Sequence, residues 1–162
     1  MLSQAELHER YEYRDGELFY KISPLPKIKV GSKAGTVNTG YIKVNIGTKK
    51  YQAHRIIWMM QYGYLPKEID HINCNKLDNR IENLREVNRT QNRYNINSYK
   101  NNTSGIKGVS WKADLKKWQV SVNVDGNRKY IGVFKDIELA ELVAMEARNK
   151  YHGEYANNGL GV

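Results

Sequence analysis

One short segment, residues 69–95, contains most of the side chains in this sequence that could do chemistry. Asp70 and His71 are adjacent, and Asn92 follows near the end of the segment. Carboxylate and amide oxygens are ligands that hard divalent ions such as Mg²⁺ accept, and histidine can act as a general base near neutral pH. This combination suits the hydrolysis of a phosphodiester, which needs a metal to offset phosphate charge and a base to activate water.

Two strands followed by a short helix are expected to hold these side chains in place. Residues 68–72 and 84–87 are predicted strands on either side of a polar loop. Residues 88–95 begin with an N-cap asparagine and its reciprocal glutamine three positions later, which predicts a helix. Neighbouring residues of a strand point to opposite faces, so Asp70 and His71 can reach one phosphate only if the strand end bends or the site lies at its rim.

The segment resembles the HNH endonucleases, whose core is the ββα-metal fold (the His-Me finger). The residues that carry the resemblance are Asp70-His71, Asn83, Asn92, the run Asn-Arg-Ile-Glu-Asn-Leu-Arg at 79–85, and the run Ala-His-Arg-Ile-Ile-Trp at 53–58. The similarity covers roughly residues 11–96 and is closest to phage-type members, including the nicking homing endonucleases.

The resemblance implies a role for each motif residue. His71 would be the general base that activates water. Asp70 and Asn92 would bind one Mg²⁺ or Mn²⁺ ion per active site. Asn83 would hold the loop between the strands and so orient His71. The implied reaction is hydrolysis of duplex DNA to 5′-phosphate and 3′-hydroxyl ends, and a single site per chain predicts a nick in one strand.

Two positions depart from the HNH pattern. Asn92 stands where the name-giving motif has histidine, which favours the branch that uses one Mg²⁺ over a zinc-dependent one. Cys74 stands where relatives usually have glycine, and we interpret it as a turn residue. As the single cysteine it excludes an intrachain disulfide and a multi-cysteine zinc site. His54 is interpreted as a packing residue, and His8 and His152 as surface residues.

The charge of the chain favours a polyanionic partner. The 162 residues include 26 Lys and Arg against 17 Asp and Glu, a net charge of +9. Residues 97–135 carry a net +6, whereas residues 136–162 carry −3, so the positive charge is concentrated. No run is apolar enough to span a membrane, and the first residues do not resemble a signal peptide. We expect a protein of the cytosol, that of the host cell if a phage encodes it.

The part of the chain before the motif predicts a β-rich cap that ends in a helix. Alternating residues around Asp15-Gly16 predict a hairpin over 11–21, and a second hairpin is predicted over 41–53. Apolar residues at helical spacing predict a helix over 54–64. Residues 97–106 are rich in Asn and Ser and are interpreted as a linker.

The last part of the chain predicts a three-stranded antiparallel sheet backed by one helix. The predicted strands are 107–112, 116–124 and 128–134, followed by a helix over 136–152. Alternation places one apolar set toward the helix: Val109, Trp111, Trp118, Val120, Val122, Val124, Ile131 and Val133. The opposite face is polar and basic, as in sheets that enter the DNA major groove, although antiparallel sheets often have a solvated face without such a role.

This region resembles the APETALA-two (ethylene-response-factor) DNA-binding domain. The matching residues are Gly108–Trp111, Lys117-Trp118, Tyr130–Phe134, Glu141, Ala144 and Tyr151–Gly153. The polar face and the positions that contact DNA in that family together predict the DNA-binding residues Lys107, Ser110, Lys112, Lys117, Gln119, Ser121, Asn123, Arg128 and Tyr130. Several of these are Arg or Glu in the plant proteins, so the plant target sequence does not transfer.

The sequence as a whole predicts an α+β protein with two domains. Residues 1–96 form the β-rich cap and HNH nuclease domain, 97–106 the linker, and 107–162 the DNA-binding domain. We expect a monomer that acts on double-stranded DNA, as a site-preferring nickase or a homing-type enzyme, without a membrane partner or a small-molecule cofactor. The alternatives are a non-catalytic DNA-binding regulator and a nuclease for structured DNA or RNA.

Overall fold

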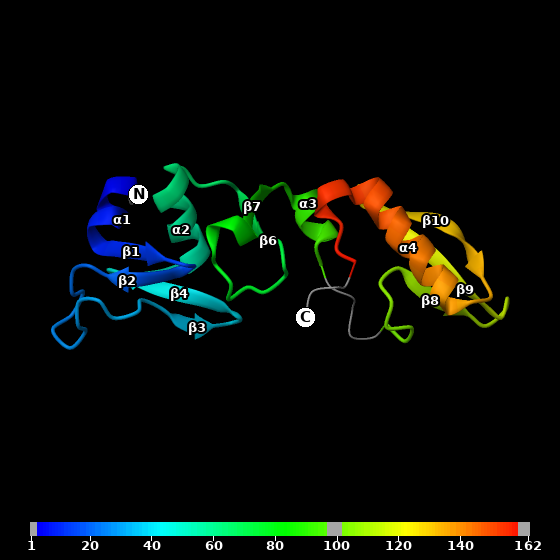
Figure 1. Ribbon diagram of the computed structural model, residues 1–162, viewed down its shortest axis with the longest axis horizontal. Coiled ribbons are helices and arrows are strands. Elements are labelled where there is room, and N and C mark those ends of the chain that lie inside the picture. Colours follow the sequence, from blue (N-terminus) through cyan, green and yellow to red (C-terminus); the bar gives the residue numbers. More distant parts are fainter. Residues whose placement is uncertain (1–2, 97–101, 159–162) are drawn as a thin grey trace. The chain divides into compact units, whose positions relative to one another are not determined.

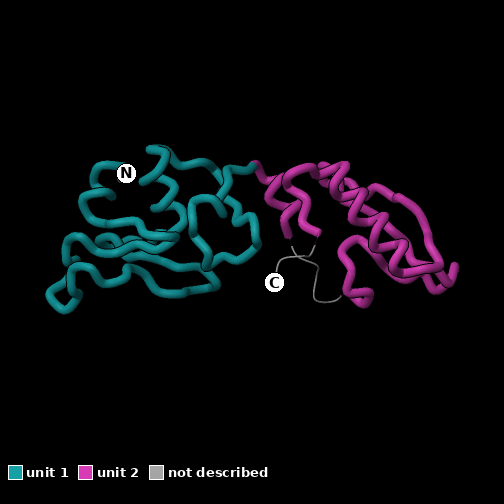
Figure 2. Tube along the Cα trace, viewed as in Figure 1, with its two compact units in different colours: residues 1–87 teal, residues 88–162 magenta. Residues whose placement is uncertain are grey.

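The computed structural model describes residues 3–96 and 102–158. Contacts divide the chain into two compact units, residues 1–87 and 88–162 (Figure 2). The sequence places the boundary after residue 96, whereas the structure groups the helix that carries Asn92 with the second unit. Half of the predicted linker, residues 97–101, lies outside the described residues. No helix in the described ranges is long and apolar enough to cross a membrane.

The first unit consists of two α-helices and three small antiparallel sheets among its described residues, ordered β1-β2, β3-β4-β5 and β6-β7 (Figure 1). Its elements are α1 (Gln4–Arg10), β1 (Tyr11–Arg14), β2 (Glu17–Tyr20), β3 (Thr36–Asn38), β4 (Tyr41–Ile46), β5 (Lys49–Gln52), α2 (Ala53–Tyr62), β6 (Glu68–His71), the 3₁₀ turn η1 (Ile81–Asn83) and β7 (Leu84–Val87). The α+β class and the predicted hairpins are therefore present.

Helix α2 anchors the β6-β7 hairpin through a shared core. Ile57 and Met60 of α2 are fully buried in the same cluster as Ile69 of β6 and Leu84 of β7. Burial of aliphatic side chains of this size stabilises a fold by about 1.5–3 kcal/mol each. The hairpin therefore has a fixed position against α2, although it pairs with no other strand in the described residues.

The second unit contains the predicted three-stranded sheet, with the order β10-β9-β8, and one long helix packed against it (Figure 1). Its elements are α3 (Arg89–Tyr94), β8 (Val109–Lys112), β9 (Lys117–Val124), β10 (Asn127–Phe134), α4 (Ile137–His152) and the 3₁₀ turn η2 (Gly153–Tyr155). Ala140 and Ala144 of α4 pack on Val109 and Val120. Small alanines let the helix approach the sheet closely, as the sequence predicts.

A β-bulge corrects the predicted faces of this sheet. The pairing of β9 with β10 shifts between Tyr130 and Gly132, and a bulge adds one residue to one strand only. Val133 therefore pairs with Gln119 on the polar face, not with the apolar set that faces α4. Trp111 also differs from expectation, because 45% of it is exposed.

Helix α3 is held within the second unit by Tyr94. The Tyr94 hydroxyl donates to Asp125 Oδ1 at 2.8 Å and accepts from the Asp125 backbone N–H at 3.0 Å. The Tyr94 ring stacks on His152 with ring centroids 3.8 Å apart. His152 is therefore buried, and its interpretation as a surface residue was wrong.

Candidate active site

Asp70 and His71 are the last two residues of β6, and both are buried. Their exposed fractions are 8% and 5%. Asp70 faces Arg85 across the hairpin, where Arg85 Nε and Nη2 donate to Asp70 Oδ2 at 3.0 and 2.8 Å. Charge-assisted bonds of this kind fix the carboxylate in one orientation. The strand end thus presents a positioned carboxylate beside a buried imidazole.

His71 lies in an aromatic environment made by α2 and β4. The ring centroids of His54 and Tyr41 lie 5.0 and 6.3 Å from that of His71. Burial lowers the pKa of His71 below its usual value, although the Asn79 hydrogen bond and the Asp70 carboxylate act in the opposite direction. Burial, and then His71, lower the pKa of His54 to about 3. Both rings are therefore neutral at pH 7, the state that a general base requires.

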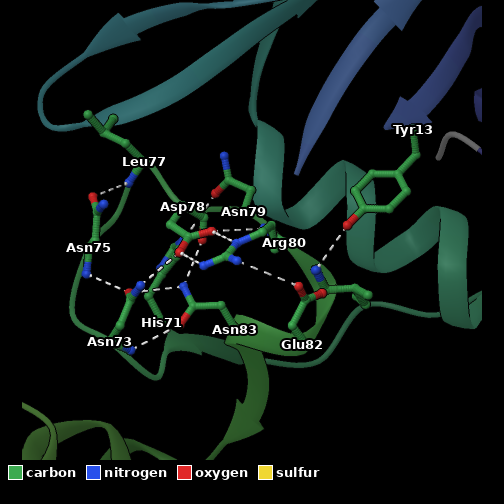
Figure 3. Close-up of polar contacts among 11 residues, drawn as sticks. Tyr13, His71, Asn73, Asn75, Leu77, Asp78, Asn79, Arg80, Glu82 and Asn83 are labelled. Carbon is green, nitrogen blue, oxygen red and sulfur yellow. Dashed lines mark hydrogen bonds and ion pairs between the residues drawn. The ribbon is translucent and has the colours of Figure 1, made fainter. Parts of the chain in front are cut away.

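Asn83 organises the loop between β6 and β7. Its Oδ1 accepts from the Asn73 backbone N–H at 3.0 Å, and its Nδ2 donates to Asn73 Oδ1 at 3.0 Å and to the Asp78 carbonyl at 2.8 Å (Figure 3). These bonds fasten both ends of the loop to one buried side chain. The geometry is that of a loop-holding residue, and a catalytic effect of Asn83 stays a prediction.

A second polar cluster closes the same loop. Arg80 Nε and Nη2 donate to the two carboxylate oxygens of Asp78 at 2.9 and 2.7 Å, and Asn73 Nδ2 donates to the same carboxylate (Figure 3). The hydrogen bonds from Arg80 lower the pKa of the Asp78 carboxyl to about 2. Asp78 is therefore a charged loop-closing residue at all physiological pH values.

The residue that contacts His71 directly in this loop is Asn79, which sequence reasoning did not single out. Asn79 Oδ1 lies 3.0 Å from His71 Nε2, and only 1% of Asn79 is exposed. A signal was present, because Asn79 begins the run Asn-Arg-Ile-Glu-Asn-Leu-Arg that carries the HNH resemblance. Nothing in the spacing separates it from the exposed asparagines of the loop.

Cys74 occupies a left-handed backbone conformation, with φ of 61°. Its N–H donates to the His71 carbonyl at 2.9 Å and so closes a tight turn directly after β6. Glycine adopts this conformation without the steric cost of a Cβ atom. The conformation fits the expectation that glycine suits this position better than cysteine.

Replacement of Cys74 by glycine should therefore stabilise the protein by up to about 1 kcal/mol, because relief of strain exceeds the extra chain entropy of glycine. Urea denaturation measures the change. Cys74→Ser is the matched control, since serine keeps the Cβ strain. A Gly variant no more stable than the Ser variant would contradict the strain assignment.

The chain offers oxygen ligands of the kind that a hard divalent ion accepts. Asp70 provides a buried carboxylate, and Asn92 provides an amide on α3, which belongs to the second unit. In the described part of the chain, no group of three or more His, Cys, Asp or Glu residues could hold an ion. The Asp70 carboxylate is a ligand that such an ion accepts, and the contribution of Asn92 stays a prediction.

The nine predicted DNA-binding residues fall into two groups. Five of them line one cavity of about 570 Å³ in the second unit, namely Lys107, Ser110, Ser121, Asn123 and Arg128. Four of these five have internal hydrogen bonds: Lys107 Nζ donates to the Tyr94 carbonyl, Arg128 Nε donates to the hydroxyl of buried Ser121, and Asn123 Oδ1 accepts from the Gly126 N–H. The other four, Lys112, Lys117, Gln119 and Tyr130, lie on the strands outside this cavity.

Comparison with known proteins finds similarity at the level of sequence. The family model described as HNH endonuclease matches residues 51–94, from β5 to the end of α3. "Protein 3.8" of Escherichia phage T7 is 34% identical over 112 residues, which is 67% of this chain and 90% of the phage protein. No solved structure matches the chain.

Proposed function

Because the chain belongs to the HNH endonuclease family and is a nuclease that acts on DNA, we propose that it is a divalent-metal-dependent enzyme that nicks duplex DNA. The observation that carries the proposal is the pair of buried side chains at the end of β6, the carboxylate of Asp70 and the neutral imidazole of His71. The family model spans all four motif residues, because it extends from residue 51 to residue 94.

Each motif residue has a separate task in the proposed reaction. His71 accepts a proton from the water that attacks the phosphorus atom. Asn83 holds the loop that follows His71. Asp70 and Asn92 would hold one Mg²⁺ or Mn²⁺ ion, whose positive charge would offset that of the scissile phosphate and the leaving 3′ oxygen. Arg85 keeps the Asp70 carboxylate oriented. The products are 5′-phosphate and 3′-hydroxyl ends.

The sheet of the second unit is proposed to position the nuclease on DNA, in the manner of the APETALA-two domain. The HNH family model ends at residue 94, before this sheet begins. Support comes from the basic residues along one face of β8 and β9, where Lys112 pairs with Lys117 and Ser110 with Gln119. Phosphate contacts from such a face give affinity and register.

The direct experiment is incubation of the full-length protein with supercoiled plasmids and source genomic DNA, with Mg²⁺, with Mn²⁺ or with EDTA. The proposal predicts conversion of supercoiled to open-circular plasmid that depends on metal. DNA binding without a nick under any of these conditions would contradict it and favour a DNA-binding regulator. Linear product at the earliest times would contradict the single-strand nick and leave the nuclease assignment intact.

Replacement of both Lys112 and Lys117 by alanine should weaken DNA binding and reduce its dependence on salt. Each lost phosphate contact lowers the slope of log affinity against log salt by about 0.9, so the pair should lower it by about 2. Fluorescence anisotropy with a labelled duplex at several salt concentrations measures the slope.

The matched control is Lys150→Ala, which removes an exposed lysine from the last turn of α4 and not from the polar face of the sheet. An unchanged slope in the double variant, or an equal loss in the control, would show that this face does not contact DNA.

A further inference from the structure

Asn79 is a fully buried amide whose side chain forms a hydrogen bond with His71. Its Oδ1 meets His71 Nε2 at 3.0 Å, whereas its Nδ2 is buried without a hydrogen-bond partner among the described residues. Burial of a polar group without a partner costs about 1–3 kcal/mol. A side chain kept at such a cost needs a compensating role, and the hydrogen bond with His71 can supply it.

The β1-β2 hairpin holds the backbone on either side of Asn79. At its turn, Gly16 has φ of +83°, and a Cβ atom there would lie 2.7 Å from the Arg80 nitrogen and 3.0 Å from the Asn79 carbonyl carbon. On β1, the Tyr13 hydroxyl accepts from the Ile81 N–H at 3.0 Å (Figure 3). The hairpin therefore touches the chain at three consecutive residues, 79 to 81.

The hydrogen bond between Asn79 Oδ1 and His71 Nε2 determines which nitrogen of His71 carries the proton. A carbonyl oxygen only accepts, so an Oδ1 facing Nε2 requires a hydrogen on Nε2. In a neutral imidazole the lone pair then lies on Nδ1. The opposite rotamer of the Asn79 amide would place a donor against Nε2 and leave the hydrogen on Nδ1. In the Nδ1–H tautomer, His71 could accept a proton only at Nε2, the nitrogen that Asn79 contacts. His71 could then not serve as the base.

We propose that Asn79 is the positioning residue that holds His71 as the Nε2–H tautomer, and that the β1-β2 hairpin in turn positions Asn79. The inference rests on the proposed function for its catalytic consequence. When the attacking water loses its proton, the O–H bond breaks and an N–H bond forms at His71 Nδ1, and solvent later removes this proton. Asn79 itself exchanges no proton and touches no reacting atom.

The tautomer can be measured without cleavage, by ¹⁵N NMR of histidine-labelled full-length protein at pH 7.5. The proposal predicts a protonated-type shift at His71 Nε2 and an unprotonated-type shift at Nδ1. An Nδ1–H tautomer in the wild type would overturn it. Because this readout needs no activity, it separates a failure of the inference from a failure of the proposed nuclease function, which the wild-type plasmid assay reports.

Two variants at the same position separate positioning from packing. Asn79→Leu keeps the approximate volume and removes the acceptor, so the single tautomer should be lost and cleavage should fall about 10- to 100-fold, with unchanged DNA affinity. Asn79→Asp keeps an acceptor facing Nε2, so it should retain the Nε2–H tautomer and most of the rate. A Leu variant with wild-type tautomer and rate would refute the positioning role, as would equal losses in the Leu and Asp variants.

A pair of glycines tests the role of the hairpin. Gly16→Ala pushes on the backbone of residues 79 and 80, whereas Gly47 also has a positive φ, of 60°, but has no atom within 4 Å of an added Cβ. Gly47→Ala therefore carries similar backbone strain without the contact. Only Gly16→Ala should disturb the His71 tautomer and lower cleavage. Equal effects of the two substitutions, or no effect of either on the tautomer, would remove the hairpin from the proposal.

Discussion

Replacement of His71 by alanine should lower the rate of metal-dependent plasmid nicking by about 10²–10⁴-fold, the usual contribution of a positioned general base. The loss follows from the chemistry of the site, because no other imidazole in the described residues can replace it. His54 is the nearest, but its pKa of about 3 makes it a very weak base. It is buried, and its ring makes an edge contact with that of His71. Single-turnover assays at saturating Mg²⁺ measure the effect on the chemical step.

The control for this substitution is His8→Ala. His8 is an exposed residue of α1 whose Nε2 lies 2.8 Å from the Met60 carbonyl. Removal of a histidine there should leave nicking and DNA affinity near wild-type values. Full activity in the His71 variant would disprove its role as the base. A loss of DNA affinity as large as the loss of rate would point to a defect in folding or binding.

Sequence reasoning located the hairpin of the site because its signals are local. Four-residue strands with apolar anchors flank a polar loop, and Ile69 and Leu84 do enter the core. The start of α3 was predictable for the same reason. Asn88 and Gln91 form the expected reciprocal cap, with bonds of 2.8 and 2.9 Å. Structural features that depend on neighbours within a few residues can be predicted from a single sequence.

Other features depend on contacts between distant parts of the chain, and these the sequence did not reveal. Asn79 is buried at a place where the distant hairpin, at Tyr13 and Gly16, contacts the backbone of residues 79–81. His152 is buried where Tyr94 of α3 stacks on its ring and Nε2 lies 2.7 Å from the Asn123 carbonyl. The bulge in β10 likewise depends on how the whole strand pairs with β9, and no residue pattern predicted it.

The pH dependence of cleavage is the second large effect that we expect. The active form of His71 is the neutral ring, and burial lowers its pKa below the usual 6.5. The rate should therefore be constant at pH values well above that pKa and fall about tenfold per pH unit once the pH drops below it. A bound cation at Asp70 shifts the inflection further in the same direction, since positive charge disfavours the imidazolium. An inflection above pH 6.5 would contradict the assignment of the base.

Acid also destabilises the fold, and the two effects must be separated. Folding keeps His54 neutral down to about pH 3, whereas its unfolded-state pKa is about 6.5. Its contribution to stability is therefore complete above pH 6.5 and is lost at roughly 1.4 kcal/mol per pH unit as the pH falls toward 3. His54→Phe should remove this loss, which urea denaturation at pH 5 and pH 7 would show. The cleavage inflection reports His71 only if near-UV circular dichroism stays native through it, because coincident midpoints would mean that the rate follows unfolding.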